Sequence, residues 1–490
     1  MALVTINGQT LEVPDGTNVI QAAALAGFDI PHYCYHPGLP IDGNCRMCLV
    51  EVEGARGPQI ACNTILKATR NKEGVEVPAA VVHTETDAVR QMRQGVMEFL
   101  LLNHPIDCPV CDQAGECGLQ DYYMEHGKYN HRSVVPKVEK LKAQPIGPNV
   151  ILDQERCILC SRCVRFTRDV TKTHELVIAG RGDKSRIEVF PGTQLDNDYA
   201  TNVVDLCPVG ALTSRDFRFK KRVWFLQTAE TICTGCSRGC NVHLDHEGGK
   251  AYRYRPRQNE SVNQWWMCDR GRFTYKAVNE GRQRDARVGS ETVPFARATQ
   301  ELRQFLTSGK VGFVVGGQAS LEDIAIAKWL AAALGARLWG LDWTEPGKED
   351  DFLMKADLTP NRRGLALLGL DADEAAFRAE LPGLSALITL GVTLPEDLVH
   401  PRIAALVTHA AAVPPGAALV LPVAVHAERQ AAYVNCDGII QHVQAAFEPS
   451  GDALPASSLL ALQAAGLGHP LPFDRDGVWK RLEAELGVMA

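Results

Sequence analysis

Fifteen of the sixteen cysteines in this 490-residue chain lie between Cys34 and Cys268, in four compact groups. Thiolate ligation of a metal centre needs two or three ligands on one tight loop and a further ligand from a distant segment, and each group has that layout. The spacing therefore predicts a chain that folds around metal centres, with iron-sulfur clusters and structural zinc as the alternatives. The groups are Cys34, Cys45, Cys48 and Cys62; Cys108, Cys111 and Cys117; Cys157, Cys160, Cys163 and Cys207; and Cys233, Cys236, Cys240 and Cys268, with Cys436 left apart.

The composition is that of an ordinary globular protein, with 46% hydrophobic and 22% charged residues, and the length allows three or more domains. The net charge of -7 argues against a nucleic-acid partner. The first residues run into a strand pattern without the features of a secretory signal, so we expect a cytoplasmic chain with reduced cysteines. The longest apolar stretches are shorter than the roughly 20 residues of a membrane span, so we expect membrane contact only through a partner.

Residues 1–85 are predicted to form a 2Fe-2S domain. Two short strand patterns, Leu3–Ile6 and Gln9–Val13, flank the hairpin dipeptide Asn7-Gly8, and a helix is predicted over Asn18–Ala26. The first cysteine group follows, and this order resembles a plant-type ferredoxin with a β-grasp fold. The plant-type spacing has four residues in its first gap, whereas ten stand here, which is typical of relatives inside large redox enzymes. Zinc is the alternative for this group.

Residues 86–145 are predicted to hold a 4Fe-4S cluster in a helical segment. The three thiolates of the second group leave such a cluster one ligand short, and His104 is the nearest neutral nitrogen. We expect His104 to lie on the apolar face of a helix that Pro105 ends, and to complete the site. The alternatives are His126, Asp107 or an open iron position. The apolar face consists of Val89, Met92, Val96, Phe99 and Leu100.

Residues 146–220 are predicted to form a second 4Fe-4S domain, of the bacterial-ferredoxin type. The third group repeats the Cys-x2-Cys-x2-Cys run of those proteins, and Cys207-Pro208 repeats its end, while Thr167 stands where a further cysteine would open a second cluster. Four arginines surround the loop, and they are interpreted either as a solvated helix face or as charges that raise the cluster potential. These arginines are Arg156, Arg162, Arg165 and Arg168.

Residues 221–285 carry the fourth group, whose spacing resembles the N-terminal 4Fe-4S site of molybdopterin oxidoreductases; a zinc ribbon is the alternative. Residues 286–490 are predicted to form an α/β domain. It lacks a dinucleotide fingerprint, and Cys436 is interpreted as a small buried hydrophobic residue. The predicted elements are strands at Val311–Val315, Ala386–Leu390, Ile403–Val407 and Ala418–Leu421, and a helix at Leu321–Leu334.

The run His104-x3-Cys108-x2-Cys111-x5-Cys117, placed after a 2Fe-2S segment, resembles the large peripheral iron-sulfur subunit, or G subunit, of respiratory complex I, NADH:quinone oxidoreductase. The stretches around Val434–Gly438 and Gln441 resemble the molybdopterin-oxidoreductase-like region of that family, here in a shortened form. The resemblance implies that His104 is a ligand and that the chain holds one 2Fe-2S and three 4Fe-4S clusters. No molybdopterin is expected.

The resemblance also implies a function: a subunit of the oxidoreductase that relays electrons from the NADH-oxidising flavin subunit toward the quinone-reducing subunits, on the cytoplasmic face of the inner membrane. Electrons would pass the first, third and second groups in that order, with the fourth group beside the path. An electron-transfer subunit of an NAD-linked hydrogenase or formate dehydrogenase is the alternative function. A catalytic molybdopterin enzyme and a structural zinc protein are more distant alternatives. No catalytic residue is visible in the sequence.

Overall fold

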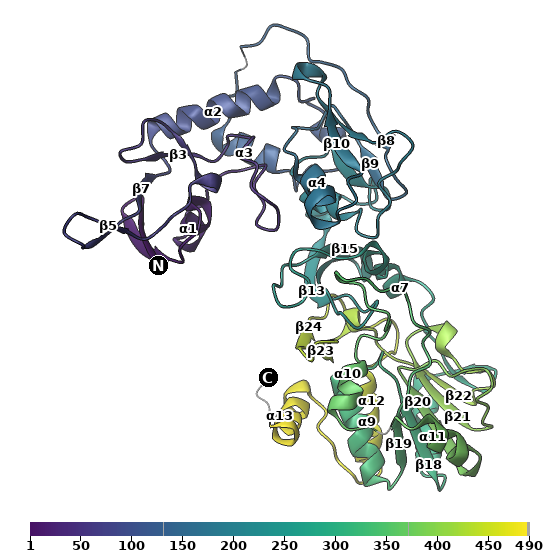
Figure 1. Cartoon of the computed structure of the whole chain (residues 1–490). Helices are drawn as coiled ribbons and strands as arrows, with labels where there is room; N and C mark the ends of the chain where they lie inside the picture. Colours follow the sequence, from purple (N-terminus) through teal and green to yellow (C-terminus); the bar gives the residue numbers. More distant parts are fainter. Residues whose placement is uncertain (131, 371, 488–490) are drawn as a thin grey trace. The chain divides into compact units, whose positions relative to one another are not determined.

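Figure 1 shows the computed structural model of the chain, which describes residues 1–130, 132–370 and 372–487. The chain divides into two compact units, Met1–Trp224 and Phe225–Ala490. Both units mix helices and strands, as the sequence predicts. No helix within the described residues is long and apolar enough to cross a membrane. The finer division into five segments stays a prediction.

The first unit opens with a five-stranded mixed sheet in the order β2-β1-β7-β3-β4. Asn7 and Gly8 both have positive φ, 49° and 86°, and make the predicted hairpin. Helix α1 (Val19–Leu25) begins at Asn18, whose side chain accepts a hydrogen bond from Gln21 N–H in a capping box. Cys48 and Cys62 belong to the core between this sheet and α1, so the first cysteine group is built into a packed domain. The strands are β1 (Ala2–Ile6), β2 (Gln9–Val13), β3 (Leu49–Val52), β4 (Gln59–Ile60) and β7 (Ala80–His83).

Helix α2 (Asp87–Leu101) forms where it is predicted, and Val89, Val96 and Leu100 of the predicted face pack inward, but the covered face is rotated away from Phe99. Arg93 and Met97 are buried, while Phe99 is 77% exposed. The helix packs on β3 and on α3 (Gly118–His126), and the Tyr33 hydroxyl donates to Met97 Sδ at 3.2 Å, so these neighbours select the covered face. The predicted placement of His104 on this helix is wrong, because the helix ends at Leu101 and His104 lies beyond it.

The rest of the first unit surrounds the third cysteine group. Helix α4 continues into a π-helical turn at Phe166–Val170, which contains the buried Thr167. A three-stranded sheet in the order β12-β9-β8 and the hairpin of β10 and β11 flank the group. The elements are β5 (Thr69–Arg70), β6 (Glu76–Val77), β8 (Gln144–Pro145), β9 (Val150–Leu152), α4 (Arg162–Arg165), β10 (Leu176–Ala179), β11 (Arg186–Val189), α5 (Asn202–Leu206) and β12 (Leu212–Ser214).

The second unit contains a three-stranded antiparallel sheet and a seven-stranded sheet in the order β17-β16-β22-β21-β20-β18-β19. In the larger sheet β19, β18, β20, β21 and β22 are parallel. The four strands predicted in this region form, three with the predicted bounds and β22 one residue later. The strands are β13 (Gln227–Ile232), β14 (Asn241–Glu247), β15 (Lys250–Pro256), β16 (Ala286–Val288), β17 (Glu291–Val293), β18 (Val311–Val315), β19 (Arg337–Gly340), β20 (Ala386–Leu390), β21 (Ile403–Val407), β22 (Leu419–Pro422), β23 (Ala431–Val434) and β24 (Ile440–Val443).

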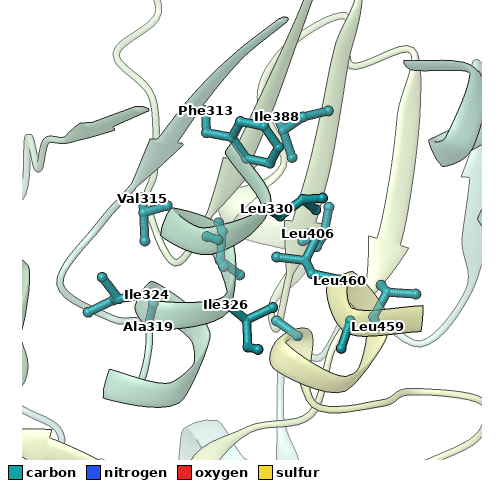
Figure 2. Close-up of a cluster of buried hydrophobic side chains, with 14 of the residues drawn as sticks. Phe313, Val315, Ala319, Ile324, Ile326, Leu330, Ile388, Leu406, Leu459 and Leu460 are labelled. Carbon is teal, nitrogen blue, oxygen red and sulfur yellow. The ribbon is translucent and has the colours of Figure 1, made fainter. Parts of the chain in front are cut away.

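Helix α9 (Leu321–Ala333) buries residues around most of its circumference because it packs on both the large sheet and α12 (Ala456–Gly466). Figure 2 shows Ile324, Ile326 and Leu330 of α9 with side chains from β18, β20, β21 and α12 in one buried cluster. This core anchors the domain that follows the fourth cysteine group. The other helices are α6 (Asp269–Arg272), α7 (Tyr275–Asn279), α8 (Phe295–Leu306), α10 (Arg362–Leu367), α11 (Glu374–Glu380) and α13 (Arg475–Leu486).

Candidate iron-sulfur sites

The third cysteine group lies on a loop that turns twice in the left-handed region. Leu159 and Ser161 have φ of 56° and 62°, which residues other than glycine adopt only occasionally. The loop directs a backbone N–H group toward a thiol of the same group: Leu159 N–H donates to Cys157 Sγ at 3.4 Å. Cys207 arrives from the end of α5, 44 residues after Cys163. The strained loop therefore positions three thiols, and a separate helix supplies the fourth.

The four thiols of this group line one small cavity of about 20 Å³, together with apolar side chains that include Leu152, Ile187 and Leu212. Burial raises the pKa of Cys157 to about 12 and the pKa values of Cys160 and Cys207 to about 11. The pKa of Cys163 is also raised, first by burial and then by its neighbouring thiols. Four thiolates cannot be charged together in this cavity without a cationic centre to balance them. The donor set thus fits an iron-sulfur core.

The fourth group is built on the turn between β13 and β14. Cys233 N–H donates to the Cys240 carbonyl at 2.8 Å, which closes the turn. Cys268 stands at the start of α6, and its Sγ accepts from Gly271 N–H at 3.3 Å. A Cβ atom at Gly271 would lie 2.8 Å from Cys233 Sγ and 3.3 Å from Cys268 Sγ. The backbone of Gly271 therefore approaches two thiols as closely as only glycine permits.

Residues far along the chain hold the fourth group in place. Cys436 N–H donates to the Ser237 carbonyl at 2.7 Å, and Gln441 Nε2 donates to the Gly239 carbonyl at 2.9 Å. The resemblance points to both residues, but their supporting role is visible only in the structure. Cys436 is half-buried, so its interpretation as a buried hydrophobic residue is wrong: the chain leaves the core after the buried Val434 and Asn435, and Cys436 contacts the cysteine loop.

The first group brings its thiols together in two pairs. Cys34 N–H donates to Cys45 Sγ at 3.4 Å, and Ala61 N–H donates to the Cys48 carbonyl at 3.0 Å, which sets Cys62 beside Cys48. A thiol-thiol hydrogen bond from Cys34 lowers the pKa of Cys45 to about 6, and the pKa of Cys34 rises correspondingly. The pKa values of Cys48 and Cys62 shift in the same opposed way. Each pair thus shares a proton that a metal would displace.

The second group is the most open of the four. Cys108 is exposed, Cys111 is buried and Cys117 is half-buried. A Cβ atom at Gly210 would lie 2.4 Å from Cys111 Sγ, so the backbone that follows Cys207 of the third group packs against a thiol of the second. Burial raises the pKa values of Cys111 and Cys117.

His104 is half-buried, and its Nδ1 is fully buried with no hydrogen-bond partner in the described part of the chain. Burial lowers the pKa of His104 to about 4, so the imidazole is neutral at physiological pH and has a free lone pair. The alternative ligands are engaged elsewhere: Asp107 pairs with Arg156 at 2.7 Å, and His126 lies 3.6 Å from Glu125. No hydrogen bond between described residues joins His104 to a thiol of the group.

Two further observations concern the predicted metal chemistry. Within residues 1–130, 132–370 and 372–487, no three His, Cys, Asp or Glu side chains are arranged to hold a single metal ion.

Of the four arginines near the third group, Arg156 and Arg165 are buried and Arg162 is half-buried, while Arg168 is exposed. The solvated-face interpretation therefore holds for Arg168 alone among these four.

Profiles of four known domains match consecutive segments that contain the four cysteine groups. Residues 2–85 match a 2Fe-2S iron-sulfur cluster binding domain, and residues 93–132 match the NADH-ubiquinone oxidoreductase-G iron-sulfur binding region. Residues 147–213 match the ferredoxin-like domain of NADH-quinone oxidoreductase subunit 3, and residues 226–280 match the molybdopterin oxidoreductase Fe4S4 domain. The chain belongs to the G-subunit family of NADH-quinone oxidoreductases. The predicted family is thereby confirmed.

Three members of the family are 37–41% identical to the chain. The G subunit of NADH-quinone oxidoreductase from Rickettsia bellii is 41% identical over 278 residues, which cover 57% of this chain and 39% of that protein. The NADH-ubiquinone oxidoreductase 75 kDa subunit of Reclinomonas americana is 37% identical over 376 residues, which cover 74% of this chain and 53% of that protein. NADH dehydrogenase [ubiquinone] iron-sulfur protein 1 of Solanum tuberosum is 40% identical over 285 residues, which cover 58% of this chain and 37% of that protein. The chain thus spans about half or less of these relatives.

Among solved structures, a chain of NAD+-reducing [NiFe]-hydrogenase in the H2-reduced state is 28% identical, with a TM-score of 0.38. The superposition covers 45% of this chain and 91% of that chain. At this TM-score the likeness does not define a shared arrangement of domains.

The approach of Gly271 to two thiols gives a direct test of the fourth site. Gly271→Ala places a methyl group against Cys233 Sγ and Cys268 Sγ, so we expect the fourth group to lose its cluster while the other groups keep theirs. Iron analysis and electron paramagnetic resonance of the purified chain measure the loss. Gly383→Ala is the matched control, because a Cβ atom there meets no atom within 4 Å. A full iron content in Gly271→Ala would contradict the assignment.

Proposed function

We propose that the chain binds one 2Fe-2S cluster and three 4Fe-4S clusters through fifteen cysteines and His104. The observation that best supports the proposal is the third group, where four thiols line one cavity in a segment that matches a ferredoxin-like domain. The proposed ligand sets are Cys34, Cys45, Cys48 and Cys62 for 2Fe-2S, and His104, Cys108, Cys111 and Cys117; Cys157, Cys160, Cys163 and Cys207; and Cys233, Cys236, Cys240 and Cys268 for 4Fe-4S.

The proposed activity is that of an electron-relay subunit in an NADH:quinone oxidoreductase. Iron-sulfur clusters supply one-electron transfer when bound, and the residues of this chain hold them, exclude water and set their potentials. The donor is the NADH-oxidising flavin subunit and the acceptor is the quinone module, both on other chains. The names of the relatives support this assignment, since they are subunits of NADH-quinone or NADH-ubiquinone oxidoreductases. Membrane contact, on the cytoplasmic face, would come through these partners.

His104 is the proposed fourth ligand of the second group because its buried Nδ1 lacks any other partner among the described residues. A neutral imidazole is the form that binds iron, and the lowered pKa keeps His104 in that form. Histidine in place of a thiolate removes one negative charge from the cluster environment, which raises the reduction potential.

Replacing His104 distinguishes it from the alternative ligand His126. We expect His104→Cys to retain a 4Fe-4S cluster at a lower potential, because a thiolate adds negative charge, and His104→Ala to lose most of that cluster. His126→Ala is the control and should leave both cluster content and potential unchanged. Potentiometric titration followed by electron paramagnetic resonance gives both readings. The assignment is wrong if His126→Ala loses the cluster and His104→Ala does not.

The host complex is tested by purifying the tagged chain from gently solubilised membranes and identifying its partners by mass spectrometry. We expect a flavin subunit and quinone-module subunits, together with iron and no molybdenum. Hydrogenase or formate dehydrogenase chains in their place would support the alternative function. Stoichiometric molybdenum on this chain would make it a molybdopterin enzyme. Either result, the other partner chains or the molybdenum, would overturn the proposed activity.

A further inference from the structure

The loops of the first and third cysteine groups are joined by direct hydrogen bonds in the first unit. Asn44 Nδ2 donates to the Leu159 carbonyl at 3.2 Å, and the Ser161 hydroxyl donates to the Asp42 carboxylate. Leu159 and Ser161 are the residues that adopt positive φ in the third group. Strained conformations persist only where the surroundings hold them, and here the first group's loop does so. The two groups therefore form one structural unit.

Arg165 lies inside this junction with only 3% of its surface exposed. Its guanidinium donates to the carbonyls of Cys34 and Cys160, the second at 3.3 Å, and to the Pro40 carbonyl at 2.5 Å. Its Nε donates to the Ser161 hydroxyl at 3.0 Å. One side chain thus binds the backbone of a candidate ligand in each of the two groups. The planar five-donor fork of arginine suits this role, and lysine could not make all these bonds.

Arg162, one turn earlier on α4, repeats the pattern. Its guanidinium donates to the Tyr35 carbonyl and, at 3.3 Å, to the Leu206 carbonyl. Tyr35 and Leu206 are the sequence neighbours of Cys34 and Cys207, which belong to the first and third groups respectively. Burial lowers the pKa of Arg162, the nearby charge of Arg165 lowers it further, and the thiols of Cys160, Cys207 and Cys34 oppose this shift.

Arg165 forms no ion pair within the described residues: the Asp42 carboxylate is linked to it only through the Ser161 hydroxyl, and the Asp169 carboxylate, whose pKa Arg168 and then Arg165 help to lower, acts on it from farther away. Its partners are neutral carbonyl and hydroxyl oxygens. A buried charge that no carboxylate contacts directly is stabilised further by an additional anionic group nearby. Clusters with thiolate ligands are anionic, and each becomes more anionic when it accepts an electron.

We propose that Arg165 is a shared positioning residue that fixes the first and third groups relative to each other and raises the reduction potentials of both clusters. This inference rests on the proposed function, since it requires a 2Fe-2S cluster at the first group and a 4Fe-4S cluster at the third. Arg165 favours the reduced state of both because its fixed positive charge attracts the added electron in surroundings of low dielectric constant. Successive steps of the relay are thereby tuned by one side chain.

The test is a potentiometric titration of both clusters, followed by electron paramagnetic resonance, in the full chain within its complex. In Arg165→Gln, which removes the charge, we expect the equilibrium constant for reduction of each cluster to fall about tenfold, or about 59 mV for a one-electron couple. Arg165→Lys keeps the charge and should recover most of the shift. Arg168→Gln is the matched control, because Arg168 is exposed and pairs with Asp169 at 2.8 Å; it should change both constants less than about twofold.

The inference is overturned if both clusters assemble in Arg165→Gln with unchanged potentials, or if Arg168→Gln shifts them equally. If Arg165→Gln loses the clusters of the first and third groups together, while the second and fourth groups stay loaded, the shared positioning role is supported; loss of only one contradicts it. Arg162→Gln then supplies the potential measurement. Absence of the 2Fe-2S or 4Fe-4S signals from the wild-type chain would instead refute the proposed function, so the two failures are distinguishable.

Discussion

The burial of thiols that must become thiolates is the constraint on which the rest of the structure depends. In the third group, burial raises the pKa values of Cys157, Cys160 and Cys207 to about 11 or 12, so these thiols favour their protonated form. Binding of a cationic iron core would reverse this preference and release protons, and it would couple cluster assembly to the formation of the surrounding fold. The protein therefore has to supply compensating charge and close backbone contacts at each site.

The backbone meets that demand in two ways. Glycines admit close approach, as at Gly271 beside Cys233 and at Gly210 beside Cys111. Left-handed residues turn the loop of the third group, and they are stabilised by hydrogen bonds from the first group's loop. Arginines that are distant in sequence supply positive charge near the thiols. Arg165, for example, donates to the carbonyl of Cys34, which lies 131 residues before it. Folding of the first domain and formation of the third site are consequently interdependent.

Sequence patterns predict the elements whose causes are local. The strands β18, β20 and β21 have the predicted bounds because each is a continuous apolar run between turn residues, and the cysteine spacing identifies all four groups. The covered face of α2 could not be predicted, since Tyr33 and α3 select Met97 over Phe99. The early end of α2, the half-buried Cys436 and the partners of Arg165 likewise depend on segments that are distant in sequence. For His104, the sequence suggests a ligand from an incomplete cysteine set, and the structure adds its buried nitrogen, which has no partner among the described residues.

Whether the four groups hold iron-sulfur clusters of the proposed types is measured by quantitative iron and acid-labile sulfide analysis of the anaerobically purified chain. Electron paramagnetic resonance of the same sample identifies the cluster types. We expect one 2Fe-2S and three 4Fe-4S clusters, which together contain about fourteen irons and about fourteen sulfides per chain. A colourless preparation with zinc in place of iron and no labile sulfide would contradict this expectation.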